Sequence, residues 1–326
     1  MKPKLLVVEC WGLGDLAIAT PFLQAACKRY DVTLLAKPYA LDLQTRFWPE
    51  VKVIPFTAPW TVFHHKYQLW IWPWLTILHT LRQLAHERFD VGLSARWDPR
   101  DHLLLWLVGV RQRVGFNRAG SGVLLSRSLP RSRTVTHQYE FWRRLAEAVD
   151  LTIPARAALL PGGPRRTGGV LIHTGAGQPV RVWPMDRYQR LARQLRQAGY
   201  AVRIACDTSQ RAWWLAAGEA EVVTPSNVTE LLRAIDAAAC IIANDSGPGH
   251  LAAFCGLPTL TLFGPQLPDR FAPLSAASEC IEGWACPHRP CSDYCRFAEP
   301  RCLLELSEKT VAERALAFVG RHLPKC

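Results

Sequence analysis

The sequence lacks any run of about 18 uncharged apolar residues, the length that a membrane-spanning helix needs. The nearest candidate, residues 69–81, is too short and contains Pro73. Glu9 and Asp15 interrupt the apolar N-terminal stretch, so no signal peptide or stop-transfer segment is indicated. These absences predict a soluble, cytoplasmic protein.

The paired C-x-x-C motifs of a zinc ribbon are also missing, although the chain has 11 cysteines. Without an export signal, free thiols are favoured over disulfides. The segment 280–302 contains five of these cysteines, and we interpret it as a structural loop with reduced thiols. A structural metal is the alternative, and its ligands would be Cys286, Cys291, Cys295 and Cys302. We expect no metal site and no cofactor that takes part in catalysis.

Acidic residues are scarce in the first half of the chain. Residues 1–160 carry 21 Lys and Arg against 12 Asp and Glu, a net charge of +9. Residues 161–326 carry 18 against 15, a net charge of +3. This asymmetry indicates an acidic partner, such as a phosphorylated lipid, an anionic membrane surface or nucleic acid. A basic surface that serves only solubility is the alternative.

Two further features of the first half each allow two interpretations. Six arginines and no acid lie between Arg111 and Arg133, which would suit acceptor phosphates or a solvated loop. Nine of the 13 tryptophans lie in residues 1–142, and core packing competes there with contact to a lipid interface. Four of them are close to basic side chains: Trp60, Trp70, Trp72 and Trp74, beside His64 and Lys66.

Short β-like runs alternate with amphipathic helical patterns along the whole chain, which predicts βαβ units and parallel sheets. The expected strands are 4–10, 32–37, 51–56, 91–96 and 113–116, then 170–173, 202–206, 221–223, 241–244 and 259–263. Helical patterns include 16–29 and 75–88, and Asn227 with Glu230 forms a capping box that opens a helix to Ala239.

Residues 153–169 have no periodicity and are rich in proline and glycine, so we interpret them as a linker. We therefore predict an α/β fold with two doubly wound Rossmann-like domains, residues 1–160 and 161–326. Ligands bind beyond the carboxyl ends of the strands in such sheets, so the active site is expected in a cleft between the two halves.

Gly12-Leu13-Gly14-Asp15-Leu16-Ala17 follows a strand and fits the dinucleotide pattern G-x-G-x-x-A. A dinucleotide site also needs an acid at the end of the second strand, to bind the ribose. Lys37 stands at that position, and Asp31 lies at the start of the strand. A nicotinamide-dependent oxidoreductase is therefore disfavoured. Asp15 is either a helix-capping residue or a general base for a substrate hydroxyl.

Two motifs in the second half have the residues of an anion site. Residues 172–184 read IHTGAGQPVRVWP, a glycine-rich turn with Arg181 nearby. Residues 241–264 read IIANDSGPGHLAAFCGLPTLTLFG, in which a helix begins after Ser246-Gly247. His250 lies in the first turn of that helix, and Asp245 just before it suits sugar hydroxyls. Each motif alone is also compatible with ordinary capping.

Together GLGD, IHTGAG with Arg-x-Trp-Pro, and NDSGPGHLAA with GLPTLTLFGP resemble glycosyltransferase family 9, the ADP-heptose:lipopolysaccharide heptosyltransferases. The resemblance covers nearly the whole chain. It implies a GT-B fold that binds the acceptor on the first half and the nucleotide-sugar on the second. It also implies inversion at the anomeric carbon without a metal, and a lipopolysaccharide-type acceptor on the cytoplasmic face of the inner membrane. No nucleic acid is implied as a partner.

The resemblance assigns Asp15 as the general base. It implies a donor site made of Thr174, Gly175, Arg181, Asp245, Ser246, Gly247 and His250. Gly14, Arg111, Arg113 and Arg118 are candidates for the acceptor, and the last helix is expected to pack back toward the first domain. The sequence departs from the family in two places, since HTGA stands for the usual HPGA and Arg181 for a lysine. A non-catalytic protein that binds anionic lipid is the remaining alternative.

Overall fold

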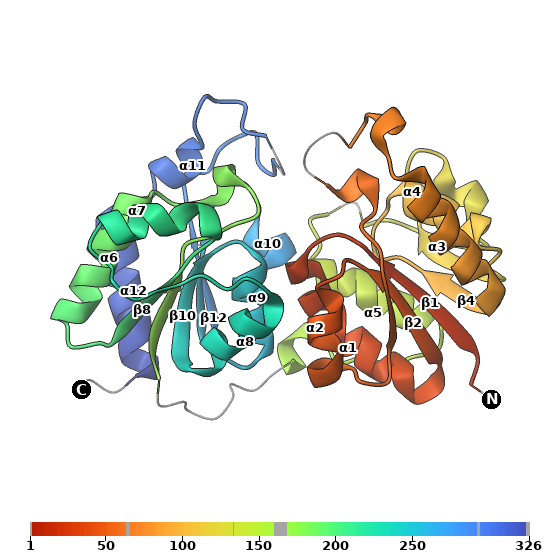
Figure 1. Ribbon diagram of the computed structural model, residues 1–326, viewed down its shortest axis with the longest axis horizontal. Coiled ribbons are helices and arrows are strands. Elements are labelled where there is room, and N and C mark those ends of the chain that lie inside the picture. Colours follow the sequence, from red (N-terminus) through yellow and green to blue (C-terminus); the bar gives the residue numbers. More distant parts are fainter. Residues whose placement is uncertain (1, 63–65, 133, 160–167, 292–293, 324–326) are drawn as a thin grey trace. The chain divides into compact units, whose positions relative to one another are not determined.

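The computed structural model describes residues 2–62, 66–132, 134–159, 168–291 and 294–323. The chain divides into two compact units, Met1–Ala155 and Arg156–Cys326, each built on its own sheet (Figure 1). The predicted boundary between residues 160 and 161 lies outside the described residues.

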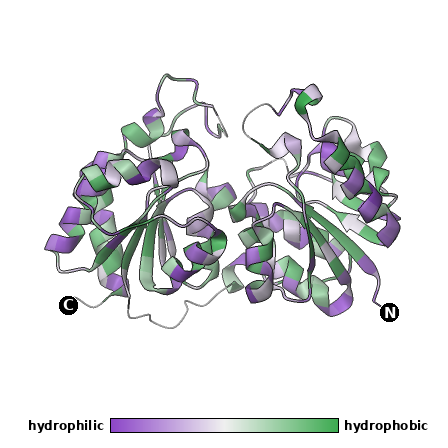
Figure 2. Cartoon of the chain, in the orientation of Figure 1, coloured by the Kyte–Doolittle hydropathy of each residue, from purple (hydrophilic) through white to green (hydrophobic). Residues whose placement is uncertain are grey.

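The first unit contains a six-stranded sheet in the order β3-β2-β1-β4-β5-β6, and every strand pair in it is parallel. This is the strand order of the Rossmann fold. The strands are β1 Lys4–Glu9, β2 Asp31–Ala36, β3 Lys52–Pro55, β4 Val91–Leu93, β5 Gln112–Phe116 and β6 Arg127–Leu129. Apolar runs give the central strands, which are green in Figure 2, because a parallel sheet covered on both faces buries nearly every side chain.

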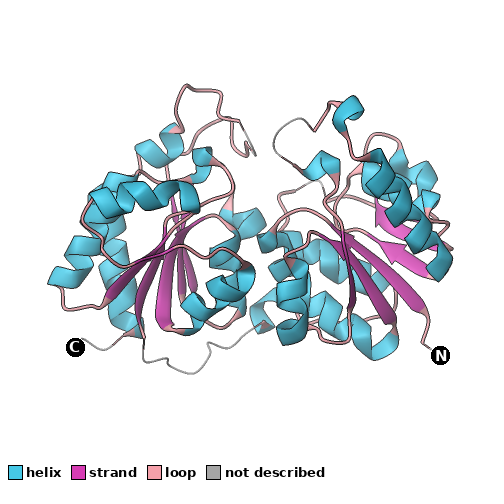
Figure 3. Ribbon diagram, viewed as in Figure 1, coloured by secondary structure: helices cyan, strands magenta, loops and turns pink. Residues whose placement is uncertain are grey.

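Helices cover both faces of this sheet (Figure 3). The helix α1 (Leu13–Arg29) packs with α2 (Ala40–Phe47) and α5 (Gln138–Ala148), and α3 (Trp74–Glu87) packs with α4 (Pro99–Leu107). One core joins Leu6 and Val8 of β1 to Ile77 of α3 and Leu104 of α4. Three 3-10 turns complete the unit: η1 Pro59–Thr61, η2 Leu69–Ile71 and η3 Ser121–Leu124.

The second unit repeats the same parallel order in its own strands, β12-β11-β10-β7-β8-β9. These are β7 Gly169–His173, β8 Val202–Ala205, β9 Val222–Val223, β10 Ala238–Asn244, β11 Thr259–Phe263 and β12 Ser278–Glu282. Its turns are η4 Arg156–Ala158, η5 Pro179–Arg181 and η6 Thr208–Gln210. Its helices are α6 Met185–Gln197, α7 Arg211–Ala216, α8 Val228–Asp236, α9 Gly247–Phe254, α10 Pro268–Phe271, α11 Arg301–Leu304 and α12 Glu308–His322.

The last helix, α12, packs against α6 and β10 of its own unit and buries Val311, Ala315 and Phe318 in that core. Its expected packing toward the first unit stays a prediction. The predicted α/β architecture with two doubly wound sheets is confirmed.

The sequence prediction was wrong at several boundaries. The helix that Asn227 opens ends at Asp236, and residues 238–239 already belong to β10. Asn227 Oδ1 accepts the Glu230 N–H at 2.9 Å, which is the first hydrogen bond of a capping box. In the second, the Glu230 carboxylate accepts the backbone N–H of Ser226 in place of that of Asn227. The edge strands β6 and β12 were not predicted, because both have largely polar sequences.

Candidate functional site

Asn244 organises the carboxyl edge of the second sheet. Its Nδ2 donates to the carbonyl oxygen of Thr174 at 2.9 Å, and its Oδ1 accepts from the Trp183 N–H at 3.0 Å and the Tyr188 hydroxyl at 2.8 Å. Asn244 is fully buried, so these bonds replace water on an amide that would otherwise be costly to bury. The end of β10, the turn after β7 and the start of α6 are thereby held together.

Thr174 and Gly175 form the turn after β7. The Thr174 hydroxyl donates to Gln210 Oε1 at 2.9 Å and accepts from Trp214 Nε1 at 3.2 Å, so it is a structural anchor. A Cβ on Gly175 would lie 2.2 Å from an oxygen of Asp207, so a larger residue here would have to displace the Asp207 side chain. The Asp207 side chain therefore lies directly against this glycine-rich turn.

Arg181, Asp245 and His250 form a group of polar side chains beside this turn. Arg181 Nη1 lies 3.5 Å from Asp245 Oδ2, and His250 Nε2 lies 3.7 Å from Asp245 Oδ1. Asp245 and His250 are buried, whereas Arg181 is partly exposed. A buried carboxylate with a cationic neighbour and a second polar side chain can bind sugar hydroxyls and still tolerate an adjacent phosphate.

The N-terminus of α9 opens beside the same group. Ser246 is the N-cap residue, but its hydroxyl donates to the carbonyl oxygens of Gly175 at 3.4 Å and Asn244 at 3.3 Å and does not cap the helix. Gly247 is the first helical residue. Because no side chain caps them, the first N–H groups of α9 suit an anion such as a diphosphate. The seven predicted donor residues thus come together at one edge of one sheet.

Asp15 lies in the first turn of α1, and both of its carboxylate oxygens have partners. Its Oδ2 accepts the Gly12 N–H at 3.1 Å, as a capping residue does, and its Oδ1 forms a short ion pair with Arg96. The Arg96 guanidinium stacks over the Trp11 ring, 5.2 Å from its centroid. The carboxylate is therefore oriented on both oxygens at the carboxyl end of β1, and each oxygen keeps a second lone pair for a proton.

Sequence reasoning missed the groups around Asp15. Burial, and next the charge of Asp15, raises the pKa of Glu9 from 4.5 to about 8, so Glu9 is mostly protonated at neutral pH. Burial likewise raises the pKa of Asp101 from 3.8 to about 7, and this side chain accepts from Trp60 Nε1 at 3.1 Å. Asp15 and Arg96 then form a neutral pair next to an uncharged Glu9. The only sequence signal was Glu9 as a charge within an apolar strand.

The predicted acceptor residues are divided between the two edges of the first sheet. Gly14 lies beside Asp15 in α1, and Arg118 follows the carboxyl end of β5. Arg111 precedes β5 at the opposite edge and pairs with Asp90 at 3.3 Å. Arg113, the second residue of β5, donates to the carbonyl oxygens of Leu124 at 2.7 Å and Val110 at 2.6 Å. Arg111 and Arg113 are thus not brought together with Asp15, and Arg113 serves a structural purpose.

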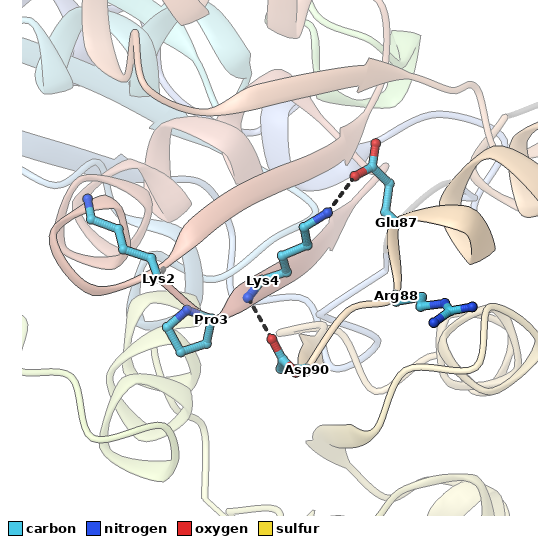
Figure 4. A pocket seen from close by; sticks show the side chains of 6 residues that line it. All are labelled: Lys2, Pro3, Lys4, Glu87, Arg88 and Asp90. Atoms are coloured by element: carbon cyan, nitrogen blue, oxygen red, sulfur yellow. Dashed lines mark hydrogen bonds and ion pairs between the residues drawn. The ribbon is translucent and has the colours of Figure 1, made fainter.

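A pocket of about 480 Å³ lies at the amino end of β1, away from Asp15 (Figure 4). Three of the charged residues that line it already bind one another, since Lys4 Nζ lies 3.0 Å from Glu87 Oε2 and the backbone N–H of Lys4 donates to Asp90 Oδ2 at 2.9 Å. In an α/β sheet, ligands bind at the other end of the strands. We therefore do not assign the substrate to this pocket.

Residues 292–293 of the cysteine loop lie outside the described residues. Ten cysteines are free thiols, and within the described residues no three His, Cys, Asp or Glu side chains are placed to hold a metal.

Trp60 is buried in the core, but Trp70 and Trp74 are exposed. His64 lies outside the described residues. Over the part of the chain that is described, no helix combines the length and apolar character needed to span a bilayer.

The family model for glycosyltransferase family 9 (heptosyltransferase) matches residues 77–300, which is more than half of the chain. The chain belongs to glycosyltransferase family 9. The family 9 match includes every predicted donor residue, whereas Gly14 and Asp15 lie N-terminal to it.

Individual relatives agree with this membership in family 9. Lipopolysaccharide heptosyltransferase 1 of Pseudomonas aeruginosa is 27% identical over 263 residues, 75% of this chain and 71% of that protein. The solved E. coli ADP-heptose lps heptosyltransferase II superposes with a TM-score of 0.72 at 20% identity, over 98% of this chain and 99% of that chain. The E. coli heptosyltransferase WaaC with ADP gives a TM-score of 0.72 at 17% identity, over 97% and 99%. The chain therefore has the GT-B architecture and is a glycosyltransferase of heptosyltransferase type.

Proposed function

We propose that the protein transfers a heptose, or a closely related sugar, from ADP-heptose to a lipopolysaccharide inner-core or other lipid-linked acceptor, with inversion and without a catalytic metal. The observation that carries the proposal is the uncapped N-terminus of α9 beside Arg181 and Asp245. Membership of family 9 and the relative solved with ADP support the choice of nucleotide.

The second unit would hold the donor. The N–H groups at the start of α9 and the Arg181 guanidinium would bind the diphosphate, while Asp245 and His250 would accept from or donate to sugar hydroxyls. Negative charge grows on the diphosphate as it leaves. Arg181 and the positive end of the helix would stabilise that charge by fixed electrostatics, in the place where other transferases use a metal ion.

The first unit would bind the acceptor. The Asp15 carboxylate would accept the proton of the acceptor hydroxyl while that oxygen attacks the anomeric carbon from the side opposite the leaving group. One C–O bond forms, the bond between the anomeric carbon and the phosphate oxygen breaks, and the electron pair leaves with ADP. The proton ends on Asp15. Gly14 and Arg118 are the remaining acceptor candidates, and we expect the protein to act on the cytoplasmic side of the membrane.

A thermal-shift panel with ADP, UDP, GDP, NAD and ADP-heptose tests the donor assignment. A ligand at about a hundred times its dissociation constant adds roughly 2.7 kcal/mol to the unfolding free energy, so binding is readily seen. Stabilisation by ADP and ADP-heptose alone is the expected result. Stabilisation by UDP or GDP would leave the reaction type but change the donor. A response to NAD alone would overturn the proposal.

A further inference from the structure

An exposed apolar surface covers η2 and the first turns of α3. We call it the η2–α3 surface, and its members are Tyr67, Leu69, Trp70, Ile71, Trp74, Leu75 and Leu78. Trp70 is 78% exposed and Leu75 is 86% exposed. The neighbouring α4, which packs against α3 (Figure 1), exposes three more large apolar side chains, Leu103, Trp106 and Leu107. Soluble proteins rarely expose so many large apolar side chains close together unless they contact a partner there.

The η2–α3 surface is held in place by a stack of tryptophans that starts in the core. The ring of buried Trp60 lies 5.8 Å from that of Trp72, which lies 5.4 Å from that of exposed Trp74. The Trp74 indole N–H also donates to the Leu69 carbonyl oxygen at 2.8 Å. Ordering an exposed indole in this way costs conformational entropy, so a fixed apolar surface is maintained for contact.

The charged side chains closest in sequence to the η2–α3 surface are basic. Residues 53–86 contain no Asp or Glu but include Lys66 and Arg82, whereas Lys52 pairs with Glu87 at the C-terminal end of α3. Leu75, Leu78 and Arg82 follow one another at i, i+3 and i+7 on α3, so a single stripe of the helix passes from apolar to basic. Figure 2 shows that α3 carries both hydrophobic and hydrophilic segments. Exposed tryptophan and leucine next to basic side chains is the composition of helices that lie in a membrane interface.

We propose that the η2–α3 surface docks the protein on an anionic lipid bilayer, with Trp70, Trp74 and Leu75 in the headgroup region and Lys66 and Arg82 on lipid phosphates. A second copy of the chain fits less well, because a two-fold contact through this surface would bring its basic residues face to face. The inference deepens the proposed function, since a lipid-linked acceptor lies in a membrane, but docking itself requires neither donor nor turnover.

Vesicle co-sedimentation of the full chain tests the proposal with the variants Leu75→Asp and Val123→Asp. Val123 is 88% exposed on η3, so it matches Leu75 in exposure and in the charge introduced, but it lies outside the η2–α3 surface. We expect the wild type to bind phosphatidylcholine vesicles only when they contain phosphatidylglycerol. Leu75→Asp should weaken that binding at least about ten-fold, and Val123→Asp much less. Arg82→Gln should weaken it about five-fold and reduce its dependence on salt.

Equal binding by all variants, or equal loss with Leu75→Asp and Val123→Asp, would overturn the proposal. The proposal would also be overturned if the wild type did not bind vesicles but formed a dimer in light scattering, and if Leu75→Asp dissociated that dimer. The η2–α3 surface would then bind a second copy of the chain. Turnover measured on an acceptor without acyl chains distinguishes the proposed sugar transfer from the proposed membrane docking. It should be unchanged in Leu75→Asp, and its absence in the wild type would refute the proposed activity while leaving the docking result intact.

Discussion

Replacing Asn244 by alanine tests whether one buried amide holds the donor site together. The change leaves the Trp183 N–H and the Tyr188 hydroxyl without their common acceptor in a buried environment. Each unsatisfied group costs about 1–3 kcal/mol. The Thr174 carbonyl oxygen keeps its bond from Gln210 Nε2 at 3.1 Å, so it adds little. The expected loss is therefore roughly 2–6 kcal/mol, a large part of the ~5–15 kcal/mol that stabilises a typical domain.

The assay is denaturant unfolding followed by circular dichroism, with Asn227→Ala as the control. Asn227 lies in the same unit, is exposed, caps α8 and donates from Nδ2 to the exposed Ser226 hydroxyl at 3.2 Å, so its loss should cost about 1 kcal/mol. ADP affinity should also fall in Asn244→Ala, because the same bonds position Asp245 and Ser246, and should stay unchanged in Asn227→Ala. A loss in Asn244→Ala no larger than that in Asn227→Ala would refute this account of the site.

The remaining predictions concern the charged groups. Asp15→Asn should lower turnover by about 10²–10⁴-fold with ADP affinity unchanged, and Asp31→Asn, at the far edge of the sheet, should change neither; full activity in Asp15→Asn would exclude a general base there. Arg181→Gln should weaken ADP binding about 10–100-fold in calorimetry, which corresponds to one charged hydrogen bond, whereas exposed Arg193→Gln serves as the unaffected control. The folded-state pKa of Glu9 is raised from 4.5 to about 8, so the stability that its protonated form contributes is complete below pH 4.5 and is lost as the pH rises to 8. Glu9→Gln should flatten the decline in unfolding free energy between pH 5 and 8, and an unchanged slope would contradict a buried, protonated Glu9.

Much of the proposed donor site could be predicted from the sequence, because its residues lie in two short segments that each follow a strand. A glycine-rich turn after an apolar run marks the carboxyl end of β7, and a Ser-Gly pair before a helix marks that of β10. Adjacent parallel strands then bring both segments to one edge, so local pattern and topology together placed Arg181 beside Asp245.

The surroundings of Asp15 could not be predicted in this way. Arg96 is 81 positions away along the chain, and it reaches Asp15 only because β4 pairs with β1. The protonation of Glu9 likewise depends on complete burial, which no sequence pattern reports. Arg111 and Arg113 misled for the same reason: a run of arginines gives charge, but only the strand direction decides at which edge each side chain lies.

The sequence alone was enough to predict two parallel sheets, apart from the edge strands β6 and β12, and the segments that carry the proposed donor residues. These follow from local periodicity, glycine positions and caps. Only the folded chain shows which carboxyl groups have a raised pKa, which of the clustered tryptophans are exposed, and that Asn244 joins three segments. Burial and contacts between distant residues are properties of the packed chain, and both are set only once the strands have paired.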